Sequence, residues 1–234
     1  IHLLKYETKI TESVDVSLFV SPQESDYFKQ LVPGCTRNVT FLSNGVDVDY
    51  FNPDIDFKTP FINGKQQIVF TGAMDYWPNQ DAVNWFVHEV FPIVRCNWPE
   101  AIFNIVGSQP SNAIVDLGRE AGIHVTGYVP DIRPFIRHAT VVVAPMRVAR
   151  GIQNKVLEAM SMAKPVVVTS RGIEGINATG GKEVIIADKA SDYIDGLSDI
   201  FSGYYKGMGD LARSRVCKDF SWNSKLTKLN QLIH

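Results

Sequence analysis

Residues 140–169, TVVVAPMRVARGIQNKVLEAMSMAKPVVVT, contain two short apolar runs separated by a polar loop and an amphipathic stretch. Both runs are rich in β-branched residues, which favours buried strands, and the stretch between them has helical spacing. We expect the helix to extend from Gly151 to Met162. A strand, a helix and a second strand in this order form the βαβ unit of a parallel sheet.

The same alternation repeats from about residue 66 onward and predicts an α/β fold. Near-continuous apolar runs indicate parallel strands covered on both faces, so we expect a doubly wound parallel sheet with helices on both faces. The predicted strands are Gln67–Thr71, Ala101–Val106, His124–Thr126, Thr140–Ala144, Pro165–Thr169 and Glu183–Ala187. The predicted helices are Asn79–Cys96, Ser111–Ala121, Ile132–His138, Gly151–Met162, Ser191–Phe201, Gly209–Phe220 and Trp222–Ile233.

The first 60 residues have a different pattern. Strands are predicted over Val14–Ser21 and Asn38–Leu42, on either side of a short helix over Pro22–Leu31. Residues 43–60 are rich in Asp, Asn, Gly and Pro, which is typical of a linker. We interpret this region as the end of one domain and a linker. Because the sequence begins with Ile1 and not with Met, we interpret its start as a point within a longer protein.

Composition and charge argue against several classes of protein. The 234 residues carry 23 basic and 25 acidic side chains without a dense basic run, which argues against a nucleic-acid partner. The apolar run at 139–145 is far shorter than the roughly 20 residues of a membrane-spanning helix. Cys35, Cys96 and Cys217 are widely spaced, so neither a zinc site nor a disulfide framework is expected and a cytoplasmic setting fits best.

Small or polar residues follow the predicted strands. In open α/β sheets, ligands bind beyond the carboxyl ends of the strands, and glycine lets a ligand approach the backbone closely. A single glycine after a strand is explained more simply by a tight turn. Together, however, the residues that follow the predicted strands locate a ligand-binding crevice, although they do not identify the ligand. These residues are Gly72, Gly107, Gly127, Pro145, Ser170 and Asp188.

The densest polar cluster follows the strand Thr140–Ala144. Arg147, Arg150 and Lys155 precede or open the predicted helix, where we expect them and free N–H groups to converge on a phosphate or diphosphate. Glu158 follows on the same helix face, where a carboxylate accepts hydrogen bonds from ribose hydroxyls. A solvated Lys–Glu pair gives the same pattern, but apolar residues on the opposite helix face favour a nucleotide site. The remaining members of the predicted cluster are Gly151, Gln153 and Asn154.

Three strings, SNGVD at 43–47, LEAM at 157–160 and KPVV at 164–167, resemble a known family. They are similar to the retaining nucleotide-sugar glycosyltransferases of the GT-B fold, the glycosyl transferases group 1 family. Within it, the chain most resembles sugar transferases of exosortase (PEP-CTERM) and exopolysaccharide loci. That likeness is carried by FTGAMDY at 70–76, PN at 78–79 and ARGIQNKVLE at 149–158, and the similarity extends from about Tyr6 to Trp222.

The resemblance implies two Rossmann-like domains, with the nucleotide sugar held mainly by the second. Residues 1–45 would end the N-terminal acceptor domain, 46–64 would form the interdomain linker, 65–220 the donor domain and 221–234 a crossing helix. The implied partners are a nucleotide sugar such as a UDP sugar, and a glycan or lipid-linked acceptor that the missing part of the first domain would bind. The truncated chain is expected to be inactive or weakly active, and peripheral membrane association of the full-length protein is compatible with the sequence.

The resemblance also implies roles for single residues. Glu158 would bind the ribose hydroxyls, Gly72 would lie near the diphosphate and the sugar, and Lys155 with Arg150 would neutralise the leaving diphosphate. Asn79 is expected in the substrate site or as the N-cap of the helix that begins near it. Backbone groups that would meet the nucleobase belong to Gly127, Tyr128 and Val129.

One departure from the family pattern concerns Arg150. The family has Glu-x7-Glu, and Arg150 stands eight positions before Glu158, where an acidic residue is expected near the donor sugar. That contact cannot be carried over, so we expect Arg150 to bind phosphate.

No metal or other cofactor is expected, and two further functions stay open. The pairs Asp47/Asp49 and Asp54/Asp56 imitate a metal motif, but they lie in a linker, whereas a divalent cation needs oxygen ligands that converge from a rigid frame. A nonhydrolysing sugar-nucleotide epimerase uses a similar scaffold, and a nucleotide-binding module without activity would also fit. A dinucleotide dehydrogenase fits least, because no Gly-x-Gly-x-x-Gly follows Gln67–Thr71.

Overall fold

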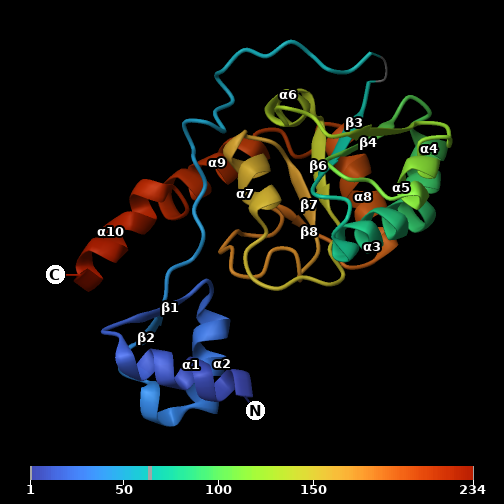
Figure 1. Cartoon of the computed structure of the whole chain (residues 1–234). Helices are drawn as coiled ribbons and strands as arrows, with labels where there is room; N and C mark the ends of the chain where they lie inside the picture. Colours follow the sequence, from blue (N-terminus) through green and yellow to red (C-terminus); the bar gives the residue numbers. More distant parts are fainter. Residues whose placement is uncertain (1, 63–64, 234) are drawn as a thin grey trace.

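A six-stranded parallel sheet forms the body of the chain, in the order β5-β4-β3-β6-β7-β8 (Figure 1). The computed structural model describes residues 2–62 and 65–233. The strand order reverses between the neighbouring strands β3 and β6, which is the switch point of a doubly wound sheet and confirms the expected fold class. The strands are β3 (Gln67–Thr71), β4 (Ile102–Val106), β5 (Ile123–Gly127), β6 (Val141–Ala144), β7 (Val166–Val168) and β8 (Ile185–Ile186).

Helices cover both faces of the sheet, which explains why its strands are apolar on both sides. The segments α3, η2, α4 and α8 pack together on one side, and α7 packs on α9 on the other (Figure 1). The sheet and helices share one hydrophobic core. The helical segments of this body are α3 (Trp77–Trp85), η2 (Phe86–Val90), α4 (Phe91–Asn97), α5 (Asn112–Leu117), α6 (Arg133–His138), α7 (Asn154–Ser161), α8 (Ala190–Phe201) and α9 (Met208–Asp219).

The helix expected over Asn79–Cys96 is divided into three segments. It begins at Trp77, passes through the π-helical turn η2 and continues as α4. Pro92 lies in the first turn of α4, and because proline lacks an N–H it cannot continue the regular hydrogen-bond ladder. The expected N-cap role of Asn79 was wrong, since Tyr76 is the N-cap and Asn79 lies in the first turn.

The helix α7 starts later than the sequence indicates. Gly151 has a left-handed φ of +66°, so it ends a loop instead of opening a helix. Gln153 is extended, and the helix begins at Asn154. The first turn of the helix, whose N–H groups were expected at Gly151, therefore begins three residues later, at Asn154.

A small N-terminal lobe precedes the body and has its own core, centred on Phe28, Cys35 and Val39. The predicted helix over Pro22–Leu31 is confirmed, but the two predicted strands shorten to a parallel pair of three residues each, with Leu18 41% exposed. A helix over the first residues was missed. The lobe contains α1 (His2–Ser13), β1 (Ser17–Phe19), α2 (Pro22–Leu31), the short 3-10 turn η1 (Pro33–Cys35) and β2 (Val39–Phe41).

The lobe joins the body at a junction with the C-terminal end of the chain. Val46 donates its N–H to the Phe220 carbonyl at 2.8 Å and forms a bridge with Ser221. A Cβ on Gly45 would lie 2.9 Å from the Trp222 indole, so the chain passes directly against that ring. The helix α10 (Trp222–Ile233) then extends away from the body (Figure 1).

Candidate functional site

A pocket of about 380 Å³ opens at the carboxyl ends of β3, β4 and β5, beside the first turns of α7. This position is where ligands bind in doubly wound sheets. We call it the strand-end pocket. Its lining residues are Thr71, Gly72, Val106, Gly107, Ser108, Tyr128, Val129, Ile132, Asn154, Lys155 and Glu158.

Two charged side chains of α7, Lys155 and Glu158, face this pocket together. They are three residues apart, about one turn, so they share a helix face as expected. Burial lowers the pKa of Lys155 to about 8, an effect that Glu158 partly opposes. Burial also raises the pKa of Glu158, and Lys155 partly opposes this shift. Both groups are therefore poorly hydrated, and a ligand of opposite charge or with hydroxyl groups would replace the missing water.

Three contacts hold the Lys155 ammonium at the floor of the pocket. It donates to Asn79 Oδ1 at 2.5 Å, lies 3.6 Å from Met146 Sδ, and is 4.4 Å from the centre of the Phe70 ring. These contacts come from α3, from the loop after β6 and from β3, so three parts of the fold hold the cation in place.

The glycines after β3 and β4 bring the two strand ends into close contact. A Cβ on Gly107 would lie 1.7 Å from the Gly72 carbonyl oxygen, a distance that no side chain tolerates. A Cβ on Gly72 would meet Asn79 Nδ2 at 2.7 Å and Lys155 Nζ at 3.2 Å. Glycine at both positions therefore keeps the pocket floor open beside Lys155.

The far end of the pocket is formed by the segment that follows β5. Tyr128 is 75% exposed, and Val129 and Ile132 line the wall. Gly127 turns the chain with a φ of +68° but does not itself line the pocket. This apolar wall suits a flat aromatic ring.

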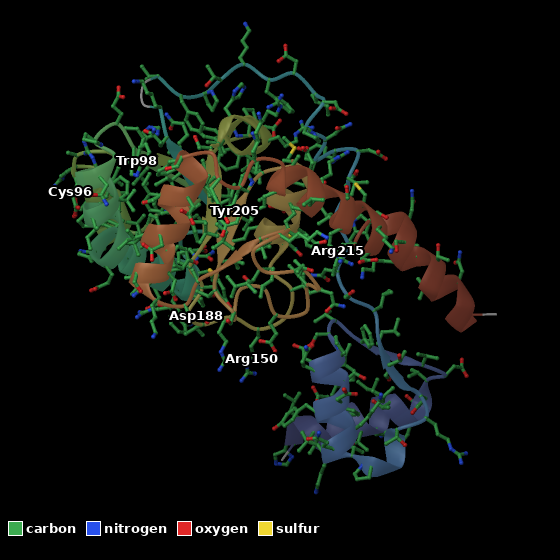
Figure 2. The ribbon with its side chains drawn as sticks, turned by 180° about the vertical axis from the view of Figure 1, so that it is seen from behind. Cys96, Trp98, Arg150, Asp188, Tyr205 and Arg215 are labelled. Atoms are coloured by element: carbon green, nitrogen blue, oxygen red, sulfur yellow. The ribbon has the colours of Figure 1, made fainter. Side chains whose placement is uncertain are left out.

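The structure separates the three cations that were expected to converge. Lys155 lines the strand-end pocket, whereas Arg147 forms an ion pair with Asp81, with Nε and Oδ2 3.0 Å apart. Arg150 lies at the edge of the body on the side of the N-terminal lobe (Figure 2). The three cations therefore do not converge on one pocket as expected, since Arg147 is paired with Asp81 and Arg150 lines a second cavity.

Arg150 and Gly151 line a second cavity of about 410 Å³, which we call the interlobe cleft. One wall comes from α2 and the residue before it, and the other from the loops after β6 and β7. Gln153 lines neither of the two cavities and donates from Nε2 to the carbonyls of Arg150 and Gly151. The cleft is lined by Ser21, Gln23, Glu24, Tyr27, Ala149, Arg150, Gly151, Arg171 and Glu174.

The sequence did not single out Thr71, Ser108 and Ile132 as pocket residues. Thr71 is 3% exposed, and its hydroxyl has no hydrogen-bond partner within the part of the chain that the structure describes. Its position as the last residue of β3, directly before Gly72, was the available signal. Ser108 could have been found by the same signal, because it lies next to Gly107 after β4.

One of the linker aspartates, Asp47, has a structural role. Asp47 Oδ1 accepts hydrogen bonds from the N–H groups of Asp49 and Tyr50, which closes a turn.

Across residues 2–62 and 65–233, no helix combines the length and the apolar character that crossing a bilayer requires.

Solved structures with the same fold come from several glycosyltransferases. A glycosyltransferase from Rickettsia africae aligns over 99% of this chain and 66% of its own, with 18% identity and a TM-score of 0.74. Anabaena HepE, solved with UDP and glucose, aligns over 98% and 66%, with 13% identity and a TM-score of 0.75. A variant of S. aureus TarM, solved with fondaparinux, alpha-GlcNAc-glycerol and UDP, aligns over 97% and 46%, with 17% identity and a TM-score of 0.75.

The aligned structures are longer than this chain, and a separate family model shows its family. The chain spans about two thirds or less of the length of these structures. A sequence search of curated proteins gave no match. The family model "Glycosyl transferases group 1" matches residues 65–202, which is more than half of the chain and includes β3, α7 and the strand-end pocket. The chain belongs to the glycosyl transferases group 1 family.

Proposed function

We propose that this chain is the donor-binding part of a transferase that moves a sugar from a nucleotide diphosphate sugar to a glycan or lipid-linked acceptor. One observation carries the proposal: Lys155 and Glu158, one helical turn apart, both line a pocket at the carboxyl ends of β3, β4 and β5. A cation and a carboxylate at that spacing suit a diphosphate and its adjacent ribose.

Each part of the nucleotide has a matching group in the strand-end pocket. Lys155 binds the diphosphate, and the backbone beside Gly72 gives it close access. Glu158 accepts hydrogen bonds from the ribose hydroxyls, a role also implied by the family resemblance. The nucleobase lies against Tyr128 and Val129 and uses their backbone groups.

Catalysis in this proposal is mainly electrostatic. The bond between the sugar C1 and the diphosphate oxygen breaks, C1 forms a new bond to an acceptor hydroxyl oxygen, and the proton of that hydroxyl passes to the departing diphosphate. Negative charge grows on the departing diphosphate, and the Lys155 ammonium stabilises it in a poorly hydrated pocket. Retention of the anomeric configuration stays a prediction from the family resemblance.

UDP is the first nucleotide to test. Anabaena HepE and S. aureus TarM, which share this fold, were both solved with UDP. We also propose that no metal takes part, since Lys155 supplies positive charge where the diphosphate would lie. The relation to exosortase and exopolysaccharide loci and the cytoplasmic location stay predictions from the sequence.

Arg150 enters the proposal on the acceptor side. Because it lines the interlobe cleft and not the strand-end pocket, it would contact the acceptor or the transferred sugar and not the nucleotide. This differs from the expected phosphate contact, and donor affinity in Arg150→Met distinguishes the two roles.

A thermal-shift panel of UDP, GDP, ADP and their sugars tests the proposal. A nucleotide at 100 times its dissociation constant is expected to stabilise the chain by about 2.7 kcal/mol. The stabilisation should fall to about 0.6 kcal/mol in Lys155→Met, where binding is expected to be about 50-fold weaker, and should also fall in Glu158→Gln, while Lys182→Met, on the loop before β8, keeps it. If no nucleotide stabilises the chain, or if these two variants still respond fully, the donor site lies elsewhere.

Activity assays on the full-length protein separate the remaining functions. Acceptor-dependent release of nucleotide is expected for a transferase. Conversion of the donor sugar without an acceptor would indicate an epimerase, and binding without turnover would indicate a regulatory module.

A further inference from the structure

The Asn79 side chain is buried beneath the floor of the strand-end pocket, with 5% of the residue exposed. Its Nδ2 donates to the Ala73 carbonyl at 2.8 Å, and its Oδ1 accepts from Lys155 Nζ at 2.5 Å. These two contacts fix the orientation of the amide, because a flip would point Nδ2 at the ammonium and Oδ1 at a carbonyl. The amide oxygen therefore faces the cation.

The other neighbours of Lys155 cannot replace this contact. The Met146 sulfur at 3.6 Å is a weak acceptor, and the Phe70 ring attracts the ammonium without directing its protons. Glu158 acts on Lys155 through charge and makes no ion pair with it within 4.0 Å in the described part of the chain. Within residues 2–62 and 65–233, the amide of Asn79 supplies the one oxygen that accepts a hydrogen bond from Lys155 Nζ.

We propose that Asn79 is a positioning residue, which holds the Lys155 ammonium charged and directs it toward the diphosphate of the donor. The identity of the ligand rests on the proposed function, but the contact between the two side chains does not. Asn79 itself touches neither substrate nor reacting atoms in this role.

The electrostatic reason follows from the burial of Lys155. Desolvation lowers its pKa to about 8, and the Glu158 carboxylate is the titratable group that opposes this shift. Phe70, Met146 and Asn79, from the other elements packed on Lys155, do not titrate. A hydrogen bond to an amide oxygen favours the charged amine, so removing it should favour the neutral form.

The first test measures the protonation of Lys155 directly, without any nucleotide. Lysines of the intact 234-residue chain are acetylated at a series of pH values, and mass spectrometry gives the midpoint at which Lys155 becomes reactive. In Asn79→Ala the midpoint is expected to fall by about one pH unit, a tenfold loss of proton affinity, and in Asn79→Asp it should rise above that of the wild type. Equal midpoints in all three proteins would overturn the proposal.

Two controls separate this effect from a general change in the fold. Lys164 has a pKa also lowered by burial to about 8, but it does not contact Asn79, so its midpoint should stay fixed in every variant. Gln80→Ala removes a neighbouring amide that donates to the Met74 carbonyl and leaves Lys155 untouched. A shift of Lys164, or of Lys155 in Gln80→Ala, equal to that in Asn79→Ala would show a merely structural role.

The second test measures UDP affinity by calorimetry near neutral pH. Asn79→Ala should weaken binding about tenfold, whereas Gln80→Ala should change it less than about twofold. If the Lys155 midpoint moves as expected but the wild type does not bind UDP, the proposed function fails for this nucleotide and the positioning role stands. If UDP binds and Asn79→Ala changes neither the midpoint nor the affinity, the positioning role fails and the proposed function stands.

Discussion

The strand-end pocket and the interlobe cleft have similar volumes, about 380 and 410 Å³, but they hold their charged groups differently. In the pocket, Lys155 and Glu158 come from one helix, and burial shifts the pKa of both. In the cleft, Arg150 and Arg171 are exposed and lie on loops of the body, opposite the lobe residue Glu24. The pocket is preformed within one core, whereas the cleft depends on how two parts of the chain meet.

This difference in burial indicates which cavity should contribute most of the binding energy for a nucleotide. A poorly hydrated cation on a rigid helix gains more from a phosphate than an exposed arginine, whose charge is screened by water. We therefore expect substitutions in the pocket to have large effects on stability or UDP binding and matched substitutions around the cleft to have small ones.

The largest effect is expected from Gly107→Ala, which changes the floor of the strand-end pocket. A Cβ there would lie 1.7 Å from the Gly72 carbonyl oxygen, so the ends of β3 and β4 must separate. We expect a loss of about 4 kcal/mol in the free energy of unfolding, measured by chemical denaturation, because backbone strain and overpacking add.

Gly151→Ala is the matched substitution in the cleft. Gly151 also has a positive φ, but the nearest atom to an added Cβ is Val20 Cγ2 at 3.9 Å. Only the left-handed backbone penalty applies, so the loss should be about 1 kcal/mol. Equal losses for the two variants would show that the pocket floor is no more tightly built than the cleft.

Lys155→Met and Arg150→Met compare the two cavities directly. Loss of the charge-assisted contact with the diphosphate should weaken UDP binding about 50-fold in Lys155→Met. Arg150→Met should change UDP affinity less than about threefold, because Arg150 lines the other cavity. Isothermal calorimetry measures both. A similar loss in both variants would mean that the loop before α7 closes over the nucleotide and joins the two cavities into one site.

The pH dependence of UDP binding should report Lys155 alone. Below its pKa of about 8 the ammonium is charged and binds phosphate, and above it the charge is lost. The diphosphate is fully ionised above about pH 7, so UDP affinity should be highest near pH 7, be about halved at pH 8 and fall by up to tenfold per pH unit above that. Calorimetry across this range measures the fall. In Lys155→Met the decrease should be absent, and a decrease that persists there would assign it to another group.

Much of the body could be predicted from the sequence, because its central strands β3, β6 and β7 are buried on both faces. Runs such as Val141–Ala144 and Val166–Val168 have few alternatives to a parallel strand, and the alternation with helices determines the fold class. The missed features depend on contacts that periodicity does not report. The π-helical turn before Pro92 and the left-handed turn at Gly151 are local backbone solutions, and α1 lies in the small lobe, outside the repeating strand–helix pattern.

The candidate site was predictable only where sequence neighbours are also spatial neighbours. Lys155 and Glu158 share a helix face by their spacing, so their common pocket followed from the sequence. Asn79 is 76 positions from Lys155, and no spacing rule relates them. Arg150 is only five positions away from Lys155 but lines the other cavity, because a loop with a left-handed glycine does not preserve direction as a helix does.

The smallest effect is expected from Arg147→Ala, which changes the cation that lines neither cavity. Its ion pair with Asp81 joins the loop to α3, but the two side chains are 50% and 24% exposed. Water and salt screen such a pair, so its loss should lower the free energy of unfolding by about 0.5 kcal/mol. UDP affinity should change less than about twofold. A loss near that of Lys155→Met would mean that Arg147 leaves Asp81 and turns to the diphosphate when the nucleotide binds, and the double variant Arg147→Ala/Asp81→Ala would then bind UDP as weakly as Arg147→Ala.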